Sequence, residues 1–489
     1  MKRLIIALFT ISVVRVFPQQ NLLIQHASIA DGTGKPLYRA DVRIAGDRIA
    51  EIGNLHPSTG ETTLDAHGLV LAPGFIDMHN HSADPESDRN AESQVSQGIT
   101  TLLVGQDGGS TLPIAEYLNK RKQQPAAFNL QTLVGHASVR QKVMGDDYKR
   151  TATPAEIKQM AAVVDQAMQE GAVGLSSGLE YEVGSYSTTE EVIELARAAA
   201  AHHGIYVSHV RDEGDHVFDS FREAIQIGEQ AHLPVEISHI KLASAAVWGK
   251  AGEAIALVDA AHKRGLDVTA DCYPYDAWAS TIKVLVLDKQ YDNPASVAKG
   301  LSDVGGPENV TITSCKAHAD YQDRNLLEIA KAKGVTPVAL YSSIVQDGGA
   351  GIVCRAMKPD DIKLFYQQPW VMVGSDGGIG MRHPRGAGTF PRVLAVYVRQ
   401  DHWLTLPDAI RKMTSAPAAR LRLADRGQIR KGAFADLVLF NPQTVQDRAT
   451  FADPLALSVG IEKVFVNGEL VWDSGHATGK HPGRVLVFE

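Results

Sequence analysis

Residues 69–81 read LVLAPGFIDMHNH, an apolar run that passes through a Pro-Gly turn and ends in two histidines, His79 and His81. The run and the turn are typical of a buried β-strand. Side chains two positions apart on a strand point to the same side, so both imidazoles would face one space. Neutral imidazole is a good ligand for zinc and similar divalent metals. Because so short a motif also arises by chance, its meaning depends on the residues downstream.

The rest of the chain alternates apolar, β-branched runs with helical patterns. After the run that ends at His79, seven more follow, at residues 99–104, 130–134, 172–175, 205–208, 235–238, 268–270 and 371–373. The clearest helix start is Thr153-Pro154-Ala155-Glu156, which combines an N-cap, a proline at the first helical position and a capping-box glutamate. Strands that alternate with helices form parallel sheets, so the chain belongs to the α/β class. Eight such units predict a TIM barrel over residues 72–423.

The two ends of the chain differ from this centre. Residues 21–71 and 424–489 contain short, alternating strands, and Asp-Gly and Gly-Asp turns separate those of the first segment. Neither end is large enough to fold comfortably alone, so we expect both to pack together as one small β-sandwich with the barrel inserted between them. Residues 280–361 exceed the length of one crossover helix, which predicts an insertion that covers the site.

The first twenty residues predict export. Lys2 and Arg3 precede an apolar run at residues 4–14, which has the length of a signal-peptide core and is too short to cross a bilayer. We expect cleavage between Pro18 and Asn21 and a periplasmic or secreted protein. The alternative is a buried N-terminal strand. No later segment reaches transmembrane length, so no membrane partner is expected once the signal is removed.

Composition restricts the class of protein. With 489 residues and 44% apolar content, the chain can bury a large core. The net charge is −8 and no Lys/Arg tract is present, which argues against a nucleic-acid partner. Cys272, Cys315 and Cys354 are too few and too scattered for a disulfide framework. Nothing in the composition favours a particular oligomeric state.

Ionisable residues follow most of the predicted strands. In a TIM barrel the catalytic residues gather at the carboxyl ends of the strands, and the polar residues found there are His79, His81, Asp107, His136, Glu180, His209, His239, Tyr273 and Asp376. Burying several such groups without a shared ion would be costly, so His209, His239 and Asp376, together with the first two histidines, predict a metal site. His136 and Tyr273 also fit packed core residues, and Glu180 also fits a solvated loop charge.

These motifs resemble the amidohydrolase superfamily and, more narrowly, the N-acyl-D-amino-acid deacylases, or D-aminoacylases. The resemblance rests on PGFIDMHNH at 73–81, SH at 208–209, SHIK at 238–241 and GSDG at 374–377. Supporting motifs are LVGH at 133–136, GLSSGLEY at 174–181, YPY at 273–275, HPR at 383–385 and GTFPRV at 388–393. The resemblance extends over nearly the whole mature chain. It includes GQIRKGAFADL at 427–437, which in the superfamily re-enters the β-sandwich.

The resemblance implies roles for individual residues. His209 and His239 correspond to ligands of a tightly held zinc, and His79 and His81 to ligands of a second position, so one or two Zn²⁺ ions are expected. Asp376 corresponds to the carboxylate that takes a proton from metal-bound water and returns it to the leaving amine. The substrate-holding positions are Lys241, Tyr181 or Tyr186, and Arg385, the last as a partner for the substrate α-carboxylate.

One position departs from the pattern. The D-aminoacylases usually carry a cysteine ligand in the turn after the second strand, whereas this chain reads VGQDGGS at 104–110. Asp107 takes that place, and a carboxylate can also bind or bridge metals. Glu180 is the alternative bridging carboxylate. The number of metals and the preferred metal therefore stay open.

Together these features imply zinc-dependent hydrolysis of small N-acyl-D-amino acids to a carboxylate and a free D-amino acid. Hydrolysis of a cyclic amide or a dipeptide is the alternative within the same chemistry. An exported binding protein with an inactive barrel is a third reading, and the complete set of histidines with Asp376 argues against it. A dinucleotide enzyme is disfavoured because no Gly-x-Gly-x-x-Gly opens a helix after the first strand.

Overall fold

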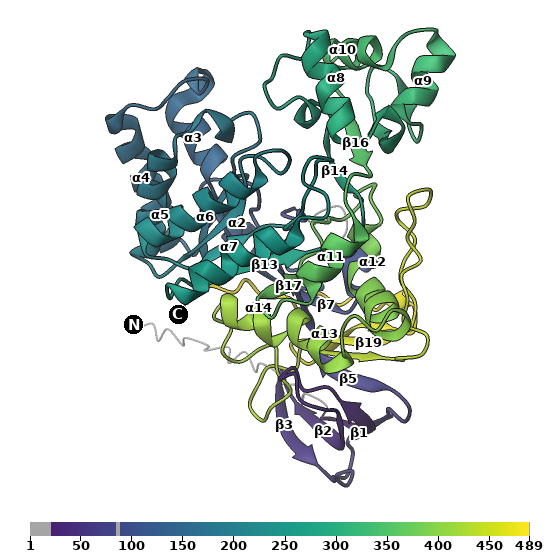
Figure 1. The fold of residues 1–489 in the computed structure, drawn as a ribbon. Helices are drawn as coiled ribbons and strands as arrows, with labels where there is room; N and C mark the ends of the chain where they lie inside the picture. Colours follow the sequence, from purple (N-terminus) through teal and green to yellow (C-terminus); the bar gives the residue numbers. More distant parts are fainter. Residues whose placement is uncertain (1–20, 85–88, 489) are drawn as a thin grey trace, which may run out of the picture.

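A computed structural model describes residues 21–84 and 89–488 (Figure 1). The predicted signal peptide and its cleavage site before Asn21 lie outside the described residues. The three cysteines are buried and unpaired. Among the described helices, none combines the length and the apolar character that crossing a bilayer requires.

Eight parallel strands of the described chain surround the centre of the molecule, as predicted. The first and last of them are joined where the backbone N–H of Asp376 donates to the carbonyl of His79 (2.8 Å) and that of His81 donates to Gly377 (2.7 Å). These hydrogen bonds close the ring, so the TIM barrel is confirmed. Its strands are β6 (Phe75–Asp77), β7 (Ile99–Val104), β8 (Asn129–Thr132) with its continuation β9 (Val134–Gly135), β10 (Gly174–Gly178), β11 (Ile205–His209), β12 (Val235–Ile237), β13 (Val268–Cys272) and β17 (Val371–Val373).

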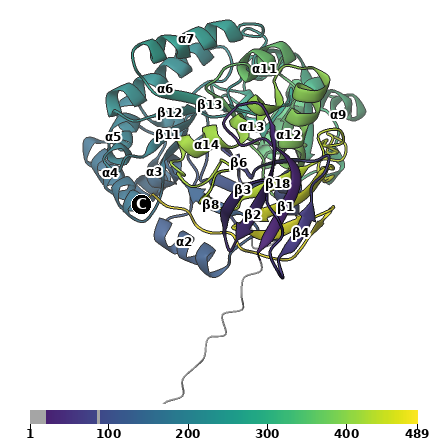
Figure 2. The same cartoon turned by 90° about the horizontal axis from the view of Figure 1, so that it is seen from below.

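Helices surround these strands in a ring that is clearest from below (Figure 2). The capping box of α4 is formed, because the Thr153 hydroxyl accepts from the Glu156 N–H (3.3 Å) and the Glu156 carboxylate accepts from the Thr153 N–H (2.7 Å). The helix therefore begins where its sequence signal predicts. The main helices of the ring are α2 (Ile114–Gln123), α3 (His136–Met144), α4 (Pro154–Gln169), α5 (Thr189–Ala200), α6 (Val217–Ala231), α7 (Ala251–Lys263), α11 (Pro359–Tyr366), α12 (Arg385–Arg392) and α13 (Leu406–Met413).

The two chain ends form one β domain, as predicted. Strand β5 from the first end pairs antiparallel with β18 from the second, within one nine-stranded sheet. Hydrogen bonds join Ile49 to Gly432 and Ala433 (2.8 and 2.9 Å), so β3 meets the segment before β18 and the sheet encloses a separate apolar core. Its strands are β1 (Leu22–Ile29), β2 (Tyr38–Ala45), β3 (Arg48–Gly53), β4 (Thr62–Asp65), β5 (Val70–Pro73), β18 (Leu437–Phe440), β19 (Ile461–Val466), β20 (Glu469–Asp473) and β21 (His476–Ala477).

Gly74 connects this β domain directly to the barrel, since β5 ends at Pro73 and β6 begins at Phe75. A Cβ atom on Gly74 would lie 2.3 Å from the side chain of Thr100, so only glycine fits at this crossing. The Pro-Gly turn therefore connects the two domains. It also fixes the start of β6, the strand after which His79 and His81 lie at the mouth of the barrel.

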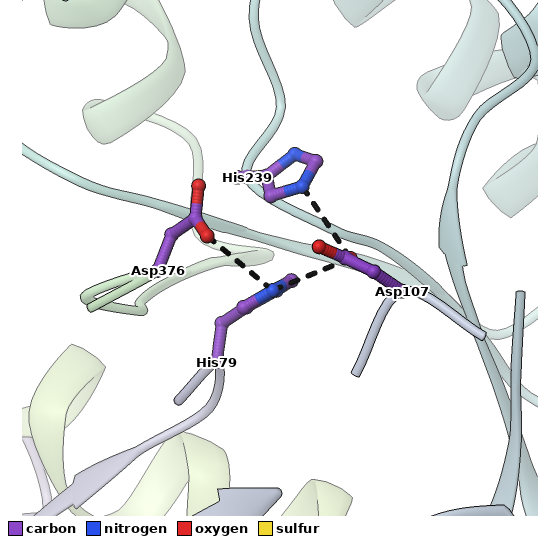
Figure 3. Close-up of side chains that lie close together, drawn as sticks. All are labelled: His79, Asp107, His239 and Asp376. Atoms are coloured by element: carbon purple, nitrogen blue, oxygen red, sulfur yellow. Dashed lines mark ion pairs between the residues drawn. The ribbon is translucent and has the colours of Figure 1, made fainter. Parts of the chain in front are cut away.

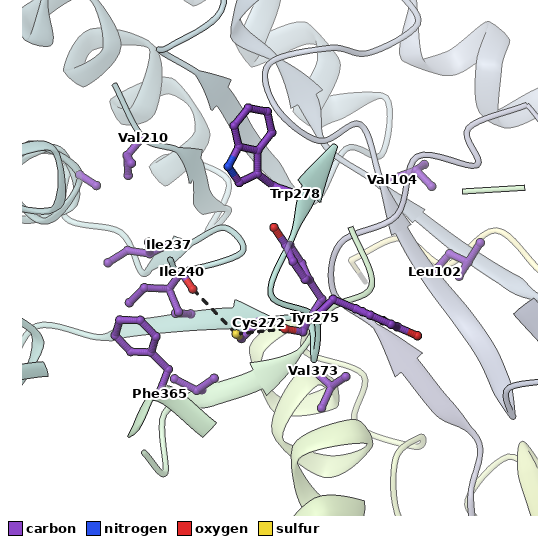
Figure 4. Close-up of a cluster of buried hydrophobic side chains, with 14 of the residues drawn as sticks. Leu102, Val104, Val210, Ile237, Ile240, Cys272, Tyr275, Trp278, Phe365 and Val373 are labelled. Atoms are coloured by element: carbon purple, nitrogen blue, oxygen red, sulfur yellow. Dashed lines mark hydrogen bonds between the residues drawn. The ribbon is translucent and has the colours of Figure 1, made fainter. Parts of the chain in front are cut away.

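A compact unit is inserted between β13 and β17. It consists of an antiparallel sheet and helices, and Figure 1 shows it at the opposite end of the barrel from β1, β2 and β3. Figure 4 shows its root, where Tyr275 and Trp278 lead away from Cys272 at the end of β13. Its elements are β14 (Trp278–Thr281), α8 (Pro294–Asp303), β15 (Val310–Ser314), α9 (Leu326–Lys333), α10 (Pro337–Gln346) and β16 (Gly351–Cys354).

Candidate active site

Ionisable side chains from four separate strands converge at the barrel mouth (Figure 3). The His79 Nε2 atom lies 3.4 Å from Asp107 Oδ1 and 3.6 Å from Asp376 Oδ1. The His239 Nε2 atom lies 3.6 Å from the same Asp107 oxygen. The donor atoms of these four residues all lie within 4.8 Å of one another, which is close enough to share a metal ion.

The remaining predicted ligands lie beside this cluster. His81 Nε2 is 3.1 Å from Asp376 Oδ1 and 3.6 Å from Asp107 Oδ2. His209 Nδ1 is 3.0 Å from His239 Nε2, and its other ring nitrogen is 3.0 Å from Glu180 Oε2. The carboxylate of Asp107 therefore faces three histidines, whereas that of Glu180 pairs with His209. This geometry favours Asp107 as the replacement for the missing cysteine.

The unpaired atoms of the cluster fit a divalent metal. Within the described part of the chain, both ring nitrogens of His79 and the Oδ1 atom of Asp107 are buried without a hydrogen-bond partner. Buried polar atoms are almost always partnered, because leaving them unsatisfied costs free energy. Imidazole nitrogens and carboxylate oxygens at these positions are the donor set that zinc accepts.

The charges of the cluster also favour a cation. Burial by itself would lower the pKa of His79, but Asp107 and the other facing carboxylates raise it well above its ordinary value. Burial and Lys241 likewise lower the pKa of His239, yet Glu213 and Asp376 outweigh them and raise it to about 9. The pKa of Asp107 is held well below its usual range by the two histidines, in spite of burial. The carboxylates thus attract positive charge, which a metal ion supplies.

Three of these residues have backbone conformations that side-chain-bearing residues rarely adopt. The φ angles of Asp107, His239 and Asp376 are 56°, 34° and 48°, all in the left-handed region. Such conformations cost on the order of 1–3 kcal/mol each and cluster at functional sites. Here the loops after β7, β12 and β17 use them to turn the three side chains toward one point.

The two predicted substrate-holding cations lie in the site but already have carboxylate partners. An Arg385 guanidinium nitrogen lies 2.7 Å from Asp376 Oδ2, and the group stacks 4.7 Å above the Tyr273 ring. The Lys241 ammonium lies 2.5 Å from Glu213 Oε1 and 2.7 Å from His239 Nδ1. Both cations therefore act on the metal-facing residues.

The structure separates the two tyrosines that were considered for substrate binding. The Tyr181 ring lies 4.4 Å from the His209 ring. It lines the cavity beside the group of candidate metal ligands, which is called the metal cluster below (His79, Asp107, His239 and Asp376). Tyr186 ends the short helix η3 (Gly184–Tyr186), which turns its ring toward Tyr148 and the Lys289 ammonium (6.2 and 5.1 Å). Tyr186 does not line that cavity, so the geometry favours Tyr181.

His136 is not part of the metal cluster. Its Nε2 atom lies 2.9 Å from Glu191 Oε1, and Arg140 pairs with the same carboxylate. All three side chains are fully buried. His136 is therefore a packed core residue, which was the alternative to a role in the metal site. Tyr273 packs under Arg385, and its hydroxyl lies 3.7 Å from the sulfur of Met357.

A cavity beside the metal residues extends beneath the inserted unit. One wall carries Tyr181, His209, His239 and Asp376. The cavity adjoins a wider one of about 690 Å³, and Glu180 and Tyr181 line both. The opposite wall is largely apolar and is formed by Trp278, Val284, Leu285, Leu287 and Val304. The inserted unit thus supplies the surface that a bound substrate would touch, while the barrel supplies the ionisable groups.

Three buried carboxylates near the site were not predicted from the sequence. Glu213 follows His209 by four residues in a loop, Asp271 lies inside β13, and Asp77 ends β6. The available signal for the last two was a carboxylate within an otherwise apolar strand, because such a group must have partners when buried. Glu213 had no comparable signal, since its loop contains several acidic residues.

Comparison with known proteins gives consistent matches along the chain. A model of the Amidohydrolase family matches residues 62–472. The chain is 37% identical to the D-aminoacylase of Alcaligenes xylosoxydans xylosoxydans, covering 96% of this chain and 97% of that protein. It is 36% identical to the N-acyl-D-aspartate deacylase of the same organism, covering 96% and 95%. The structure of the N-acyl-D-glutamate deacylase from Bordetella bronchiseptica, complexed with zinc and a phosphonate mimic of the tetrahedral intermediate, gives a TM-score of 0.88 at 33% identity, covering 96% of this chain and 100% of that chain.

Proposed function

Because this chain belongs to the amidohydrolase family and is a metal-dependent hydrolase of carbon–nitrogen bonds, we propose that it cleaves N-acyl-D-amino acids with the help of zinc. The products would be a carboxylate and a free D-amino acid. The single observation that supports this reaction most is the convergence of Asp376 with His79, Asp107 and His239 at the barrel mouth.

In the proposed reaction Asp376 is the residue that moves protons. Burial would raise the pKa of its carboxyl group, but the Arg385 guanidinium and His239 hold it well below the usual range. Asp376 is therefore ionised, the form that accepts a proton from the attacking water and later returns it to the leaving nitrogen. Arg385 holds the Oδ2 atom, which leaves Oδ1 facing the histidines. His79, Asp107 and His239 would hold a divalent cation there, which would supply Lewis acidity toward the scissile carbonyl and toward water.

The cavity wall supports a neutral, apolar amino-acid side chain in the substrate. Two of its acidic residues, Asp215 and Asp303, share the Lys299 ammonium (2.6 Å each), and its one lysine, Lys241, pairs with Glu213. Within the described residues, the inner cavity therefore offers an acidic side chain no unpaired cation, whereas Lys283, Lys289 and Lys316 line the wider cavity. Apolar groups of the substrate would be buried against the wall of the inserted unit, which is worth about 25 cal/mol per Å².

Turnover of matched N-acetyl-D-leucine and N-acetyl-L-leucine by enzyme of known zinc content tests this proposal. We expect hydrolysis of the D-enantiomer with a clear preference over the L-enantiomer. A cyclic amide and a dipeptide belong in the same panel, since they represent the alternative reactions. Faster turnover of either would replace the proposed substrate class.

We also propose that the protein is exported, on the basis of its basic and then apolar first residues. Mass spectrometry of protein recovered from a secreting host should give a mature N-terminus between Pro18 and Asn21. Intact residues 1–20 on cytosolic protein would contradict export.

A further inference from the structure

Asp271 is a buried carboxylate directly beneath the metal cluster to which no step of the proposed reaction assigns a role. It lies inside β13, between the strands that carry His239 and Asp376, and its side chain is fully buried. One of its oxygens, Oδ2, has no hydrogen-bond partner within the described residues. A buried carboxylate with an unsatisfied oxygen is costly, so its position requires an explanation.

The first contact of Asp271 is with the backbone of His239. The His239 N–H donates to Asp271 Oδ1 at 3.0 Å. His239 has a φ angle of 34°, a conformation that must be held by its surroundings. A charge-assisted hydrogen bond from a rigid strand provides such a restraint. It therefore helps to keep the His239 Nε2 atom directed at Asp107.

The second contact is with the ring of His79. Asp271 Oδ2 lies 3.8 Å from His79 Nδ1, while His79 Nε2 faces Asp107 and Asp376 on the other side. A carboxylate that faces Nδ1 favours the tautomer with its proton on Nδ1. That tautomer leaves the lone pair of Nε2 available to a metal.

The carboxylate has little freedom to leave this position. A Cβ atom on Gly374 would lie 2.4 Å from Asp271 Oδ1, so the absence of a side chain at Gly374 makes room for it. The neighbouring strand β12 contributes Glu236, which is also fully buried and accepts from the Thr269 hydroxyl (3.2 Å). Arg420 lies 3.8 Å from Glu236 on the side away from the metal cluster.

We infer that Asp271 is a positioning residue for the metal centre, which fixes the backbone of His239 and the tautomer of His79 with its two oxygens. The inference rests on the metal centre of the proposed function and not on its substrate. Groups that orient metal-binding histidines in this way typically contribute 10- to 100-fold in metal affinity or activity.

The variant Asp271→Asn tests this role sharply. Its amide oxygen can keep the bond to the His239 N–H, but its NH₂ group would then face His79 Nδ1 and favour the opposite tautomer, with the proton on Nε2. We expect zinc affinity, measured by competition with a chromophoric chelator, to fall by about 10- to 100-fold. The absorption spectrum of the Co²⁺-loaded variant should also differ from that of the parent.

Glu236→Gln is the matched control, because Glu236 is equally buried on the neighbouring strand but, among the described residues, forms no hydrogen bond or ion pair with His79 or His239 and acts on His79 only through its charge. It should bind zinc within a few-fold of the parent and keep the parent Co²⁺ spectrum. Parent-like zinc affinity in Asp271→Asn, or an equal loss in Glu236→Gln, would overturn the inference.

A measurement on the parent protein covers the case in which Asp271→Asn does not fold. A neutron structure of the zinc-loaded protein locates the His79 proton directly. The inference requires that proton on Nδ1, facing Asp271, and a proton on Nε2 would refute it. Because neither readout uses turnover, failure of the substrate proposal would leave these results unchanged.

Discussion

The carboxylate of Asp77 accepts hydrogen bonds from both the backbone N–H (2.8 Å) and the hydroxyl (2.6 Å) of Ser375. These contacts join the end of β6 to the end of β17, although 298 residues of chain separate the two. Asp77 also accepts from the Asn80 side chain at 2.8 Å. Since His79 and Asp376 are close neighbours of these residues in sequence, this buried junction sets the distance between the first histidines and the Asp376 carboxylate.

Replacement of Asp77 by alanine should therefore reduce both stability and activity. Burial raises the pKa of Asp77 to about 6, although hydrogen bonds from Ser375 and Asn80 lower it in part. At neutral pH the carboxylate is therefore ionised, and its removal leaves these buried donors without a partner. Each buried donor left unpaired costs about 1–3 kcal/mol, and we expect the free energy of unfolding to fall by about 2–5 kcal/mol. Denaturant unfolding and kcat are the measurements.

Asp361→Ala is the control for this effect. Asp361 is similarly buried and accepts from the Gly249 and Ala251 N–H groups (2.7 and 3.1 Å), away from the metal residues. It should lose comparable stability and keep its kcat under folding conditions. Equal loss of kcat in both variants would show that Asp77 acts only through global stability.

The variant Asp376→Asn should lose the proton-transfer step while it keeps its shape. General acid–base help of this kind is worth about 10²–10⁴-fold, so kcat should fall by a factor in that range. Zinc content should remain, because His209 and His239 are unchanged. A kcat within a few-fold of the parent would remove Asp376 from the mechanism.

Asp107→Ala should lower zinc content and activity together, since its carboxylate faces His79, His81 and His239. Asp107→Cys should retain zinc, because thiolate is a strong zinc ligand. Zinc analysis of both variants, with Glu180→Ala for comparison, separates the two candidate carboxylates. Full zinc content in Asp107→Ala together with loss in Glu180→Ala would assign the role to Glu180.

Zinc affinity should rise with pH. The pKa of His239 is raised to about 9 and that of His79 lies well above its ordinary value, so the metal-free protein carries protons on both rings at neutral pH. A metal must displace these protons, and each displaced proton makes the apparent affinity increase about tenfold per pH unit. Chelator competition between pH 6 and 9 measures the slope. A flat profile would mean that neither histidine binds the metal.

Specificity should follow the apolar wall of the inserted unit. Leu287 lines the cavity and is 42% exposed, so Leu287→Arg adds a cation there with little risk to folding. We expect kcat/KM to fall for N-acetyl-D-leucine and to rise for N-acetyl-D-glutamate. Leu364→Arg, on α11 and 39% exposed, is the control and should leave the ratio unchanged. A parent enzyme that prefers the acidic substrate would contradict this assignment of the wall.

The barrel and much of the metal cluster could be predicted because both leave local signals. The runs that became β7, β11 and β17 are apolar and bounded by turns, and the residues that follow them, such as Asp107 and Asp376, mark the barrel mouth. A parallel barrel brings those ends together whatever the loops contain.

The residues that support the cluster could not be predicted in the same way. Asp271 lies one residue beyond the end of its predicted strand, and only the three-dimensional approach of Gly374 and His79 shows its role. The orientation of Tyr186 depends on η3, a short turn without periodicity in its sequence. Contacts between residues distant in sequence, such as Asp77 and Ser375, have no sequence period that could reveal them.

The chain enters and leaves the inserted unit at directly paired residues, since Trp278 on β14 lies opposite Cys354 on β16. Because its two ends lie side by side, the inserted unit could be replaced as a single segment. A shorter or foreign segment that spans the same pair would leave the barrel strands and their ionisable residues in place. Evolution or a protein engineer can therefore change which substrate is accepted by replacing this segment, without rebuilding the barrel residues beneath it.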